Sequence, residues 1–226
     1  MAIKIQSTAD FGTDGIKTVI YGASGVGKTR LARTASNCII LSAEKGLLSL
    51  NNEDIPYIEI SRPKDVDDAY AFLKSDTEYQ TVFLDTISEI GEVLLTDFLL
   101  HGHDGAAVKD GRQAYRMLAD AMMPMIRNYR DLPGKNIVFL AKMEVKDDED
   151  GITNYRPMIP GQVIKNQLPY MFDGLWNMDI QKVNKEDVGV LQTTATRGRY
   201  CKDRSGNLDQ FERPDIDAIF AKAKGT

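Results

Sequence analysis

Short, almost continuously apolar runs alternate along the first 140 positions with stretches in which apolar residues recur every three or four positions. The apolar runs are residues 17–21, 38–41, 81–84 and 136–140. Runs of this length are typical of strands that are buried on both faces. Because strands that alternate with helices indicate βα units, we predict an α/β fold with a mostly parallel sheet flanked by helices.

Four stretches have the apolar spacing of helices. One opens at Lys28, one follows Pro63, one runs through residues 87–98, and the longest covers about residues 112–130. Apolar residues of the longest stretch, several methionines among them, fall on one stripe of the helix. We expect these methionines to pack in the core rather than to form a ligand site.

The pattern changes after residue 142. Loops are expected first, then strand-like segments at 175–181 and 188–196 and a basic hairpin near 199–204, which would extend the same sheet in antiparallel fashion. The acidic run at 147–150 precedes Gly151 and is interpreted as a solvated turn rather than a metal site. We therefore predict a single domain over 1–226, with an N-terminal extension at 1–15, a nucleotide-binding core at 16–142, and loops and C-terminal strands at 143–226.

Composition narrows the class of protein. With 42% hydrophobic and 27% charged residues, the chain has enough apolar material for a sizeable core. It has no long apolar run, so we expect a cytoplasmic protein without a membrane partner. Cys38 and Cys201 lie too far apart and too isolated for a disulfide scaffold or a zinc cluster. A net charge of −5 excludes a protein that is basic all over.

A phosphate-binding motif follows the first predicted strand and opens the first predicted helix. The sequence fits G-x-x-x-x-G-K-[ST] over its whole length, in the structural context that this motif requires. Its backbone N–H groups and its lysine would bind the phosphates of ATP, and its threonine would hold Mg²⁺. The predicted nucleotide-binding residues are Gly22, Ala23, Ser24, Gly25, Val26, Gly27, Lys28, Thr29 and Arg30.

Two carboxylates follow other apolar runs. Asp85 follows the run 81–84 and is the candidate for the second magnesium-binding residue, which would hold the ion through water; the alternative is a cap for the helix that begins near Ile87. Glu44 follows the run 38–41 and is placed to orient the water that attacks the terminal phosphate; the alternative is an ordinary solvent-facing glutamate.

Together, the phosphate loop, the Ala43–Leu47 segment and the Val82–Thr86 segment resemble the RecA-like ATPases, in particular the small phage single-strand annealing recombinases. The likeness runs from about Ile16 to Arg213. It implies a RecA-like P-loop fold, Glu44 as the catalytic glutamate and ATP-dependent single-stranded DNA binding. It also implies a homo-oligomeric filament or ring in the bacterial host cytoplasm, with a single-strand-binding protein as a further partner.

The resemblance extends to other residues, but at some of these positions the sequence differs from the family's pattern. Lys202 and Arg204 are similar to paired cations that reach, in these ATPases, the nucleotide of the neighbouring subunit, although Asp203 replaces the family's asparagine between them. As catalytic residues in trans they would leave an isolated subunit a slow ATPase. Lys142 stands near the place where RecA has a glutamine that contacts the terminal phosphate, so Lys142 either touches phosphate or faces solvent.

Nucleic-acid binding rests mainly on this resemblance. Residues 197–213 have a local charge of only +2, so other contacts must contribute. The candidates lie in or near two expected loops and are Lys109, Arg112, Tyr155, Arg156 and Lys165. His101, His103 and Asp104 have partial metal-ligand spacing, which we interpret as coincidental.

Three functions remain open at this level. The first is ATP-dependent annealing of single-stranded DNA by a RecA-like ATPase. The second is a P-loop kinase of a nucleotide or small molecule, which the shortage of arginines in 143–165 disfavours. The third is a nucleotide-gated module that recruits other proteins.

Overall fold

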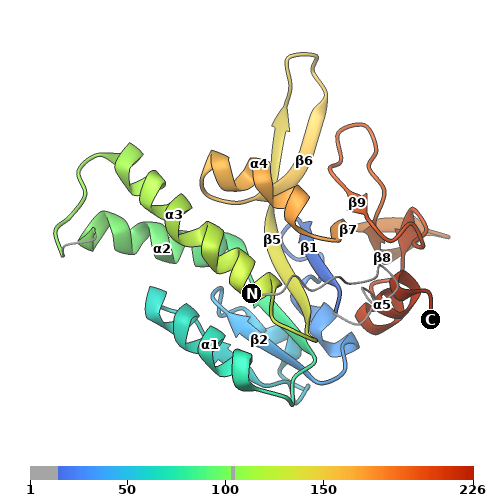
Figure 1. The fold of residues 1–226 in the computed structure, drawn as a ribbon. Helices are drawn as coiled ribbons and strands as arrows, with labels where there is room; N and C mark the ends of the chain where they lie inside the picture. Colours follow the sequence, from blue (N-terminus) through green and yellow to red (C-terminus); the bar gives the residue numbers. More distant parts are fainter. Residues whose placement is uncertain (1–14, 103–104) are drawn as a thin grey trace, which may run out of the picture.

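The computed structural model describes residues 15–102 and 105–226, which form one mixed sheet with helices on both faces (Figure 1). Within these residues the strands are β1 Lys17–Gly22, β2 Cys38–Ser42, β3 Tyr57–Glu59, β4 Thr81–Asp85, β5 Asn136–Asp147, β6 Thr153–Met158, β7 Gly174–Val183, β8 Glu186–Gln192, β9 Lys202–Asp203 and β10 Phe211–Glu212. The α-helices are α1 Pro63–Ser75, α2 Ile87–His101, α3 Gly111–Arg130, α4 Gln162–Met171 and α5 Ile216–Lys224, and two short 3₁₀ helices are η2 Thr29–Thr34 and η3 Leu47–Leu50.

The main sheet has the strand order β10-β8-β7-β1-β5-β4-β2-β3. The strands from β7 to β3 in this order run parallel to their neighbours, while β8 and β10 are antiparallel to theirs. Off this path, β6 pairs with β5 and β9 pairs with β7, both antiparallel. The predicted fold class, an α/β core with a mostly parallel sheet and antiparallel strands near the C-terminus, is confirmed.

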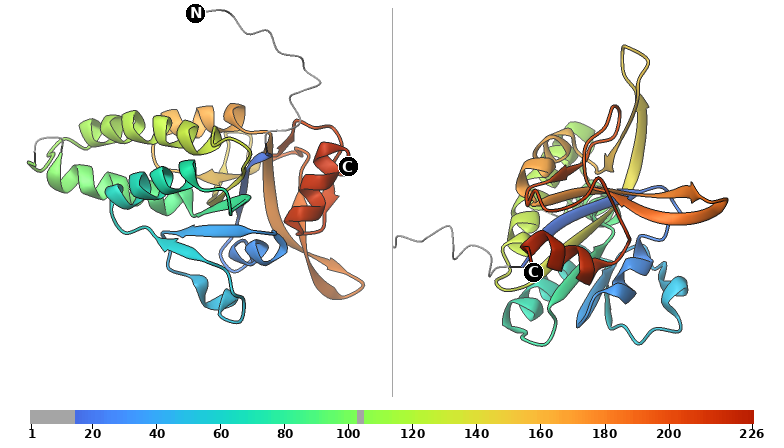
Figure 2. Two further views of the ribbon diagram at one scale, coloured as in Figure 1. Left: turned by 60° about the horizontal axis from the view of Figure 1, so that its bottom comes forward. Right: turned by 90° about the vertical axis from the view of Figure 1, so that its right-hand side faces the viewer.

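Alternate side chains of the parallel strands enter two different hydrophobic layers, as the period of a strand requires. Val19, Leu84 and Phe139 pack with α1 to α4 on one face. Ile20 and Phe83 pack with η2 and α5 on the other face. Figure 2 shows α5, in red, on the side of the sheet away from α2 and α3. Both faces of the central strands are therefore covered, which explains why their sequences are apolar throughout.

Several details of the sequence interpretation are confirmed. Helix α3 begins within a residue of its predicted start, and its methionines at 117, 122, 123 and 125 are buried in the core. Cys38 and Cys201 are free and buried. The acidic run 147–150 lies at the tip of the β5–β6 hairpin. Apart from these predictions, the described part of the chain contains no helix with the length and apolarity to cross a membrane.

Other expectations are wrong. The helix after the phosphate loop is the six-residue 3₁₀ helix η2, not an α-helix. The stretch after residue 142 is not mainly loop: β5 continues to Asp147, pairs with β6 in a hairpin that stands out from the helices (Figure 1), and α4 follows. Strand β7 extends the sheet in parallel with β1, so the extension becomes antiparallel only at β8.

Candidate functional site

The carboxyl ends of four parallel strands meet at one edge of the sheet. The register pairs Gly22 of β1 with Lys142 of β5, and Ser42 of β2 with Asp85 of β4. Neighbouring strands are about 4.8 Å apart, so side chains at these ends converge on a common site. A cavity of about 490 Å³ lies there, and its lining includes the phosphate-loop residues 22–25 and 27–30, Glu44 and Lys142.

The phosphate loop has the backbone geometry that its glycines allow. Gly27 has φ of +97°, a conformation that L side chains rarely adopt, and a side chain at Gly22 would place Cβ 2.5 Å from the carbonyl oxygen of Met178. Lys28 Nζ donates to the carbonyl oxygens of Gly22 (3.0 Å) and Ala23 (2.8 Å). The ammonium is thus folded back over the mouth of the loop that would surround the phosphates.

Thr29 and Asp85, which are 56 positions apart, are in contact. Thr29 Oγ1 donates to Asp85 Oδ2 at 2.7 Å, and Asp85 is buried behind this contact with only 2% of the residue exposed. Its other oxygen, Oδ1, is buried without a hydrogen-bond partner among the described residues. A carboxylate oxygen and a hydroxyl with spare acceptor capacity are ligands that Mg²⁺ prefers, so this pair fits the ion. No cluster of three or more histidine, cysteine or carboxylate side chains within 15–102 and 105–226 competes as a metal site.

The charges of the site perturb one another. Burial raises the pKa of Asp85 to about 6, and the neighbouring Glu44 adds to the rise, while the hydrogen bond from Thr29 opposes it. Burial lowers the pKa of Lys28, although Glu44 and Asp85 counteract part of the effect. A site with two carboxylates and partly desolvated lysines is suited to bind a polyanion together with a metal ion. The metal ion would compensate the carboxylates, and the polyanion would compensate the lysines.

Glu44 lies on the loop that follows β2, beside the end of β4. Its backbone N–H and that of Ala43 donate to the carbonyl oxygen of Asp85 (3.3 and 2.8 Å). Its carboxylate accepts a hydrogen bond from Thr86 Oγ1 (2.8 Å) and keeps a third of the side chain exposed to the cavity. The geometry thus holds one oriented carboxylate next to the predicted phosphate position.

Arg30 and the paired cations occupy different places. Arg30 is exposed at the rim of the cavity. Lys202 Nζ donates to the carbonyl oxygen of Pro169 (2.5 Å), and Arg204 bonds to Asp173 (3.1 Å) and to the carbonyl oxygen of Tyr170. Strand β9 pairs with the start of β7, which is level with the start of β1, so Lys202 and Arg204 lie at the opposite end of the sheet from Gly22. They are not brought to the phosphate loop of their own chain.

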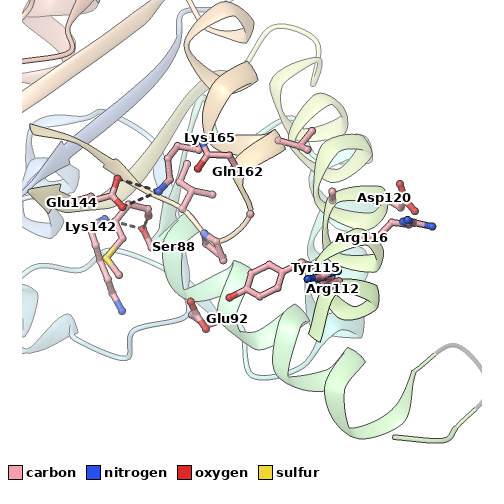
Figure 3. Close-up of a pocket in the computed structure, with 16 residues that line it drawn as sticks. Ser88, Glu92, Arg112, Tyr115, Arg116, Asp120, Lys142, Glu144, Gln162 and Lys165 are labelled. Atoms are coloured by element: carbon pink, nitrogen blue, oxygen red, sulfur yellow. Dashed lines mark hydrogen bonds and ion pairs between the residues drawn. The ribbon is translucent and has the colours of Figure 1, made fainter. Parts of the chain in front are cut away.

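A second, larger cavity of about 790 Å³ adjoins the first. This groove lies between α2, α3 and the start of α4, and Lys142 and Met158 line both cavities. Figure 3 shows Tyr115 reaching from α3 into the groove with Arg112 beside it, and Lys142 on the opposite side. The Tyr115 side chain was not among the predicted site residues, because its helical spacing is equally typical of core packing.

The predicted DNA-contacting residues are divided by the structure. Arg156 and Lys165 both pair with Glu144, at 2.5 and 2.9 Å. The ring of Tyr155 lies under the Arg199 guanidinium, 4.5 Å from its centroid. Arg112 lines the groove and Lys109 is exposed.

One candidate ligand of the possible histidine site at the end of α2 is in hydrogen-bond contact with another side chain. His101 Nδ1 is 3.0 Å from Asp97 Oδ1 on its own helix. His103 and Asp104 lie outside the described residues.

The chain was also compared with known proteins. The sequence matches the family described as "AAA domain" over residues 14–205. No curated protein is similar enough in sequence to count as a match. Among solved structures, a KaiC-like protein from the hyperthermophilic archaeon Pyrococcus horikoshii is similar with a TM-score of 0.45 and 12% identity, over 79% of this chain and 77% of that one.

Proposed function

The chain belongs to the AAA domain family of P-loop ATPases, and from this premise we propose that it binds Mg²⁺-ATP at the strand-end cavity and hydrolyses it. The observation that carries the proposal is the contact between Thr29 and Asp85 beneath the loop that holds Lys28. The phosphate loop, Thr29 and the oriented carboxylate of Glu44 then line one cavity, and Asp85 is in contact with Thr29.

Each side chain has a defined task. Lys28 exchanges the carbonyl oxygens of Gly22 and Ala23 for phosphate oxygens, which are better partners for an ammonium group. Thr29 and Asp85 would hold Mg²⁺, and the bound ion would neutralise charge on the phosphates. Glu44, fixed by Thr86, orients a water molecule and accepts its proton as the water attacks the terminal phosphorus, while the bond from that phosphorus to the bridging oxygen breaks and ADP leaves with the electron pair.

Replacing Lys28 tests the nucleotide site. We expect Lys28→Ala to lose at least about 100-fold in affinity for Mg²⁺-ATP, measured by calorimetry, because two or more charge-assisted contacts are removed. Lys45→Ala is the matched control: this lysine is close in sequence but pairs with Glu59 at the surface. Equal affinities in the Lys28 variant and the control would remove the phosphate assignment.

We further propose that the ATPase acts on single-stranded DNA as an annealing protein. The resemblance to phage recombinases supports this, and so does the groove beside the nucleotide cavity. Its Arg112 guanidinium has no ion-pair partner among the described residues, and Tyr115 is 49% exposed, so that phosphate contact and base stacking are both available.

A fluorescent oligonucleotide titrated with and without ATP, at two salt concentrations, tests this proposal. We expect binding that requires ATP, that weakens with salt, and that weakens further in Arg112→Ala and Tyr115→Ala. Arg127→Ala, on the same helix but far from the groove, serves as the control. Affinity that is independent of ATP and of the groove variants would exclude the DNA role. A kinase gains no support from the structure, because Arg156, the single arginine of 143–165, is already paired with Glu144.

Assembly completes the proposal. Lys202 and Arg204 lie too far from the phosphate loop of their own chain to contact its nucleotide, and we propose that they contact the nucleotide of a neighbouring copy in a filament or ring. Such a head-to-tail interface repeats without a twofold axis and places one subunit's cations beside the next subunit's ATP. A single-strand-binding protein is proposed as a further partner.

A further inference from the structure

Leu48 is an exposed apolar side chain beside the nucleotide cavity. It lies in η3, and 82% of the residue is exposed to solvent. Its neighbours Gly46 and Ser49 line the cavity, so Leu48 stands at the rim of the site proposed for ATP. Single exposed leucines are common on protein surfaces, so the position of this one matters more than its exposure.

An apolar pocket of about 330 Å³ (the α4 pocket) lies beside the paired cations. Its apolar lining includes Pro157, Ile159, Leu168, Pro169, Leu175 and Tyr200. Lys202 Nζ donates to the carbonyl oxygen of Pro169. The Arg204 guanidinium donates to the carbonyl oxygen of Tyr170, which also lines the pocket. The α4 pocket therefore has room for an apolar side chain and is held next to both cations.

Leu48 and the α4 pocket belong to opposite faces of the sheet. Leu47 and Leu50, on either side of Leu48 in η3, pack in the hydrophobic layer that η2 and α5 cover. Ile159 and Leu168 of the pocket belong to the layer that α1 to α4 cover. One subunit therefore cannot place Leu48 in its own pocket, whereas a head-to-tail interface joins two different faces of successive copies.

The surroundings of Leu48 and of the α4 pocket have opposite charge. Glu53 and Asp54 follow η3, are exposed, and take part in none of the ion pairs of the described residues. Beside the pocket, Arg156 and Lys165 share one carboxylate, that of Glu144. The paired cations add to this surplus of positive charge. Complementary charge of this kind favours the approach of the two surfaces in one orientation.

We propose that Leu48 of one copy enters the α4 pocket of the next copy and anchors the head-to-tail interface. This inference rests on the proposed assembly, in which Lys202 and Arg204 contact a neighbour's nucleotide. In that arrangement, the leucine at the rim of one nucleotide cavity and the pocket beside the neighbour's cations come to the same interface. An apolar anchor in a pocket, with charged groups around it, is the usual centre of a specific protein interface.

The test is self-association measured by analytical ultracentrifugation with Mg²⁺ and a slowly hydrolysed ATP analogue. Loss of a buried leucine predicts that Leu48→Ala weakens self-association about 10- to 100-fold. Tyr200→Ala removes one wall of the pocket and is expected to weaken it at least about 10-fold. Since both changes remove the same contact, the double variant should be at most about threefold weaker than the weaker of the two single variants. Urea denaturation checks that each variant folds.

Leu100→Ala is the matched control, because this leucine is also exposed but lies near the C-terminal end of α2. It should leave self-association within about twofold of the wild type, alone or combined with Tyr200→Ala. If the effects of Leu48→Ala and Tyr200→Ala multiply as independent changes, or if either is absent, the inference is overturned and the assembly stands. Weaker oligonucleotide binding by Tyr200→Ala with unchanged self-association would assign the pocket to a base and overturn it as well. A wild-type protein that stays monomeric with the ATP analogue removes both the proposed assembly and the anchor.

Discussion

Asp85 combines deep burial with an incomplete set of partners. One of its oxygens accepts from Thr29, and the other is buried without a partner among the described residues. Burial disfavours the charged form and raises its pKa to about 6, whereas an ordinary, solvent-exposed aspartate has a pKa of 3.8. The ionised side chain therefore lowers the free energy of unfolding when no metal ion is bound. Residues of binding sites commonly destabilise the free protein in this way and are stabilised by their ligand.

This balance predicts how stability depends on pH. Because the folded-state pKa of Asp85 is the higher one, its stabilising contribution is complete below about pH 4 and is lost as pH rises through about 6. In Mg²⁺-free and nucleotide-free solution, the free energy of unfolding of the wild type relative to Asp85→Asn should fall by up to about 3 kcal/mol between pH 4 and 7. Urea denaturation at several pH values measures this difference.

Asp65→Asn is the control with the opposite sign. A backbone hydrogen bond from Ser61 and the Arg62 side chain lower the pKa of Asp65, so its contribution grows as pH rises above its folded pKa. The free energy of unfolding of the wild type relative to Asp85→Asn should fall with pH. If this difference rises with pH or stays constant, burial does not raise the pKa of Asp85.

Glu44 is predicted to act in the chemical step alone. Glu44→Gln keeps the hydrogen bond to Thr86 possible but removes the base, so we expect phosphate release to slow by about 100-fold or more while ATP affinity changes little. Glu59→Gln, on the neighbouring strand β3, is the surface control. Turnover at the wild-type rate in the Glu44 variant would assign the proton acceptor elsewhere.

At this scale, sequence reasoning succeeded where a residue belongs to a local pattern. The eight-residue motif and the apolar run before Asp85 were enough to predict that Thr29 and Asp85 converge. The pair of Glu89 with Lys142 was not predicted, because the two residues are 53 positions apart and on different elements. No local spacing distinguishes a glutamate in the first turn of a helix that faces a strand end from one that faces solvent.

Helices and strands were predictable from the sequence where their residues are buried in the core. They were not predictable where the residues are exposed. Strand β5 is buried up to Ala141 and becomes exposed beyond it, so its apolar signal stops although its pairing with β6 continues. Helix α4 contains Pro169. A proline in a sequence normally predicts the end of a helix, but this one lies near the C-terminal end of α4 and the helix forms. The 3₁₀ form of η2 follows from backbone hydrogen bonding that residue type alone does not determine.

Packing between elements makes a prediction at Gly91. This residue of α2 lies against the segment that joins β6 to α4, and a Cβ there would be 2.5 Å from Pro160 Cγ and 3.2 Å from Met122 Sδ. Alanine favours a helix by about 1 kcal/mol over glycine. We nevertheless expect Gly91→Ala to lower the free energy of unfolding by about 1–3 kcal/mol. The new methyl group would overlap the ring of Pro160, and this rigid ring can make room only if the backbone shifts.

Gly111, the first residue of α3, supplies the comparison, since a Cβ at that position meets no atom within 4 Å. Gly111→Ala should leave the free energy of unfolding within about 0.5 kcal/mol of the wild type or raise it. Urea denaturation of the two variants side by side separates the packing effect from helix propensity. Equal stability in both would show that α2 and the Pro160 segment shift apart easily.

Across the whole molecule, the proposed nucleotide-binding residues and the paired cations lie at opposite ends of the parallel sheet. Gly22, Asp85 and Lys142 meet at the carboxyl ends of β1, β4 and β5, while Arg204 lies beside the start of β7. The run from Thr18 to Gly22 spans about 13 Å. The strand order needed for this sorting was predictable only in outline, because the sequence does not show which parallel strands are neighbours.

The separation of the two ends gives a test of assembly. An arginine that reaches a neighbour's nucleotide contributes on the order of 10³–10⁵ in rate, whereas the surface contacts of Arg204 with Asp173 and Tyr170 contribute little to stability. We therefore expect Arg204→Ala to fold and bind ATP but to hydrolyse it very slowly. Lys28→Ala is inactive for a different reason, the loss of its own phosphate contact. Each variant retains the group that the other has lost.

Mixing the two inactive variants should restore activity if Arg204 acts across an interface. In a random one-to-one assembly, about a quarter of the interfaces combine an intact phosphate loop with an intact arginine, so up to about a quarter of the wild-type rate is expected. Phosphate release by the mixture, compared with the sum of the separate variants, measures the recovery. A mixture of Lys28→Ala with the double variant Lys28→Ala/Arg204→Ala contains no intact phosphate loop and should stay inactive. If the first mixture shows no more than the sum of its parts, Arg204 has no role in a neighbouring site, and hydrolysis must be completed within one subunit.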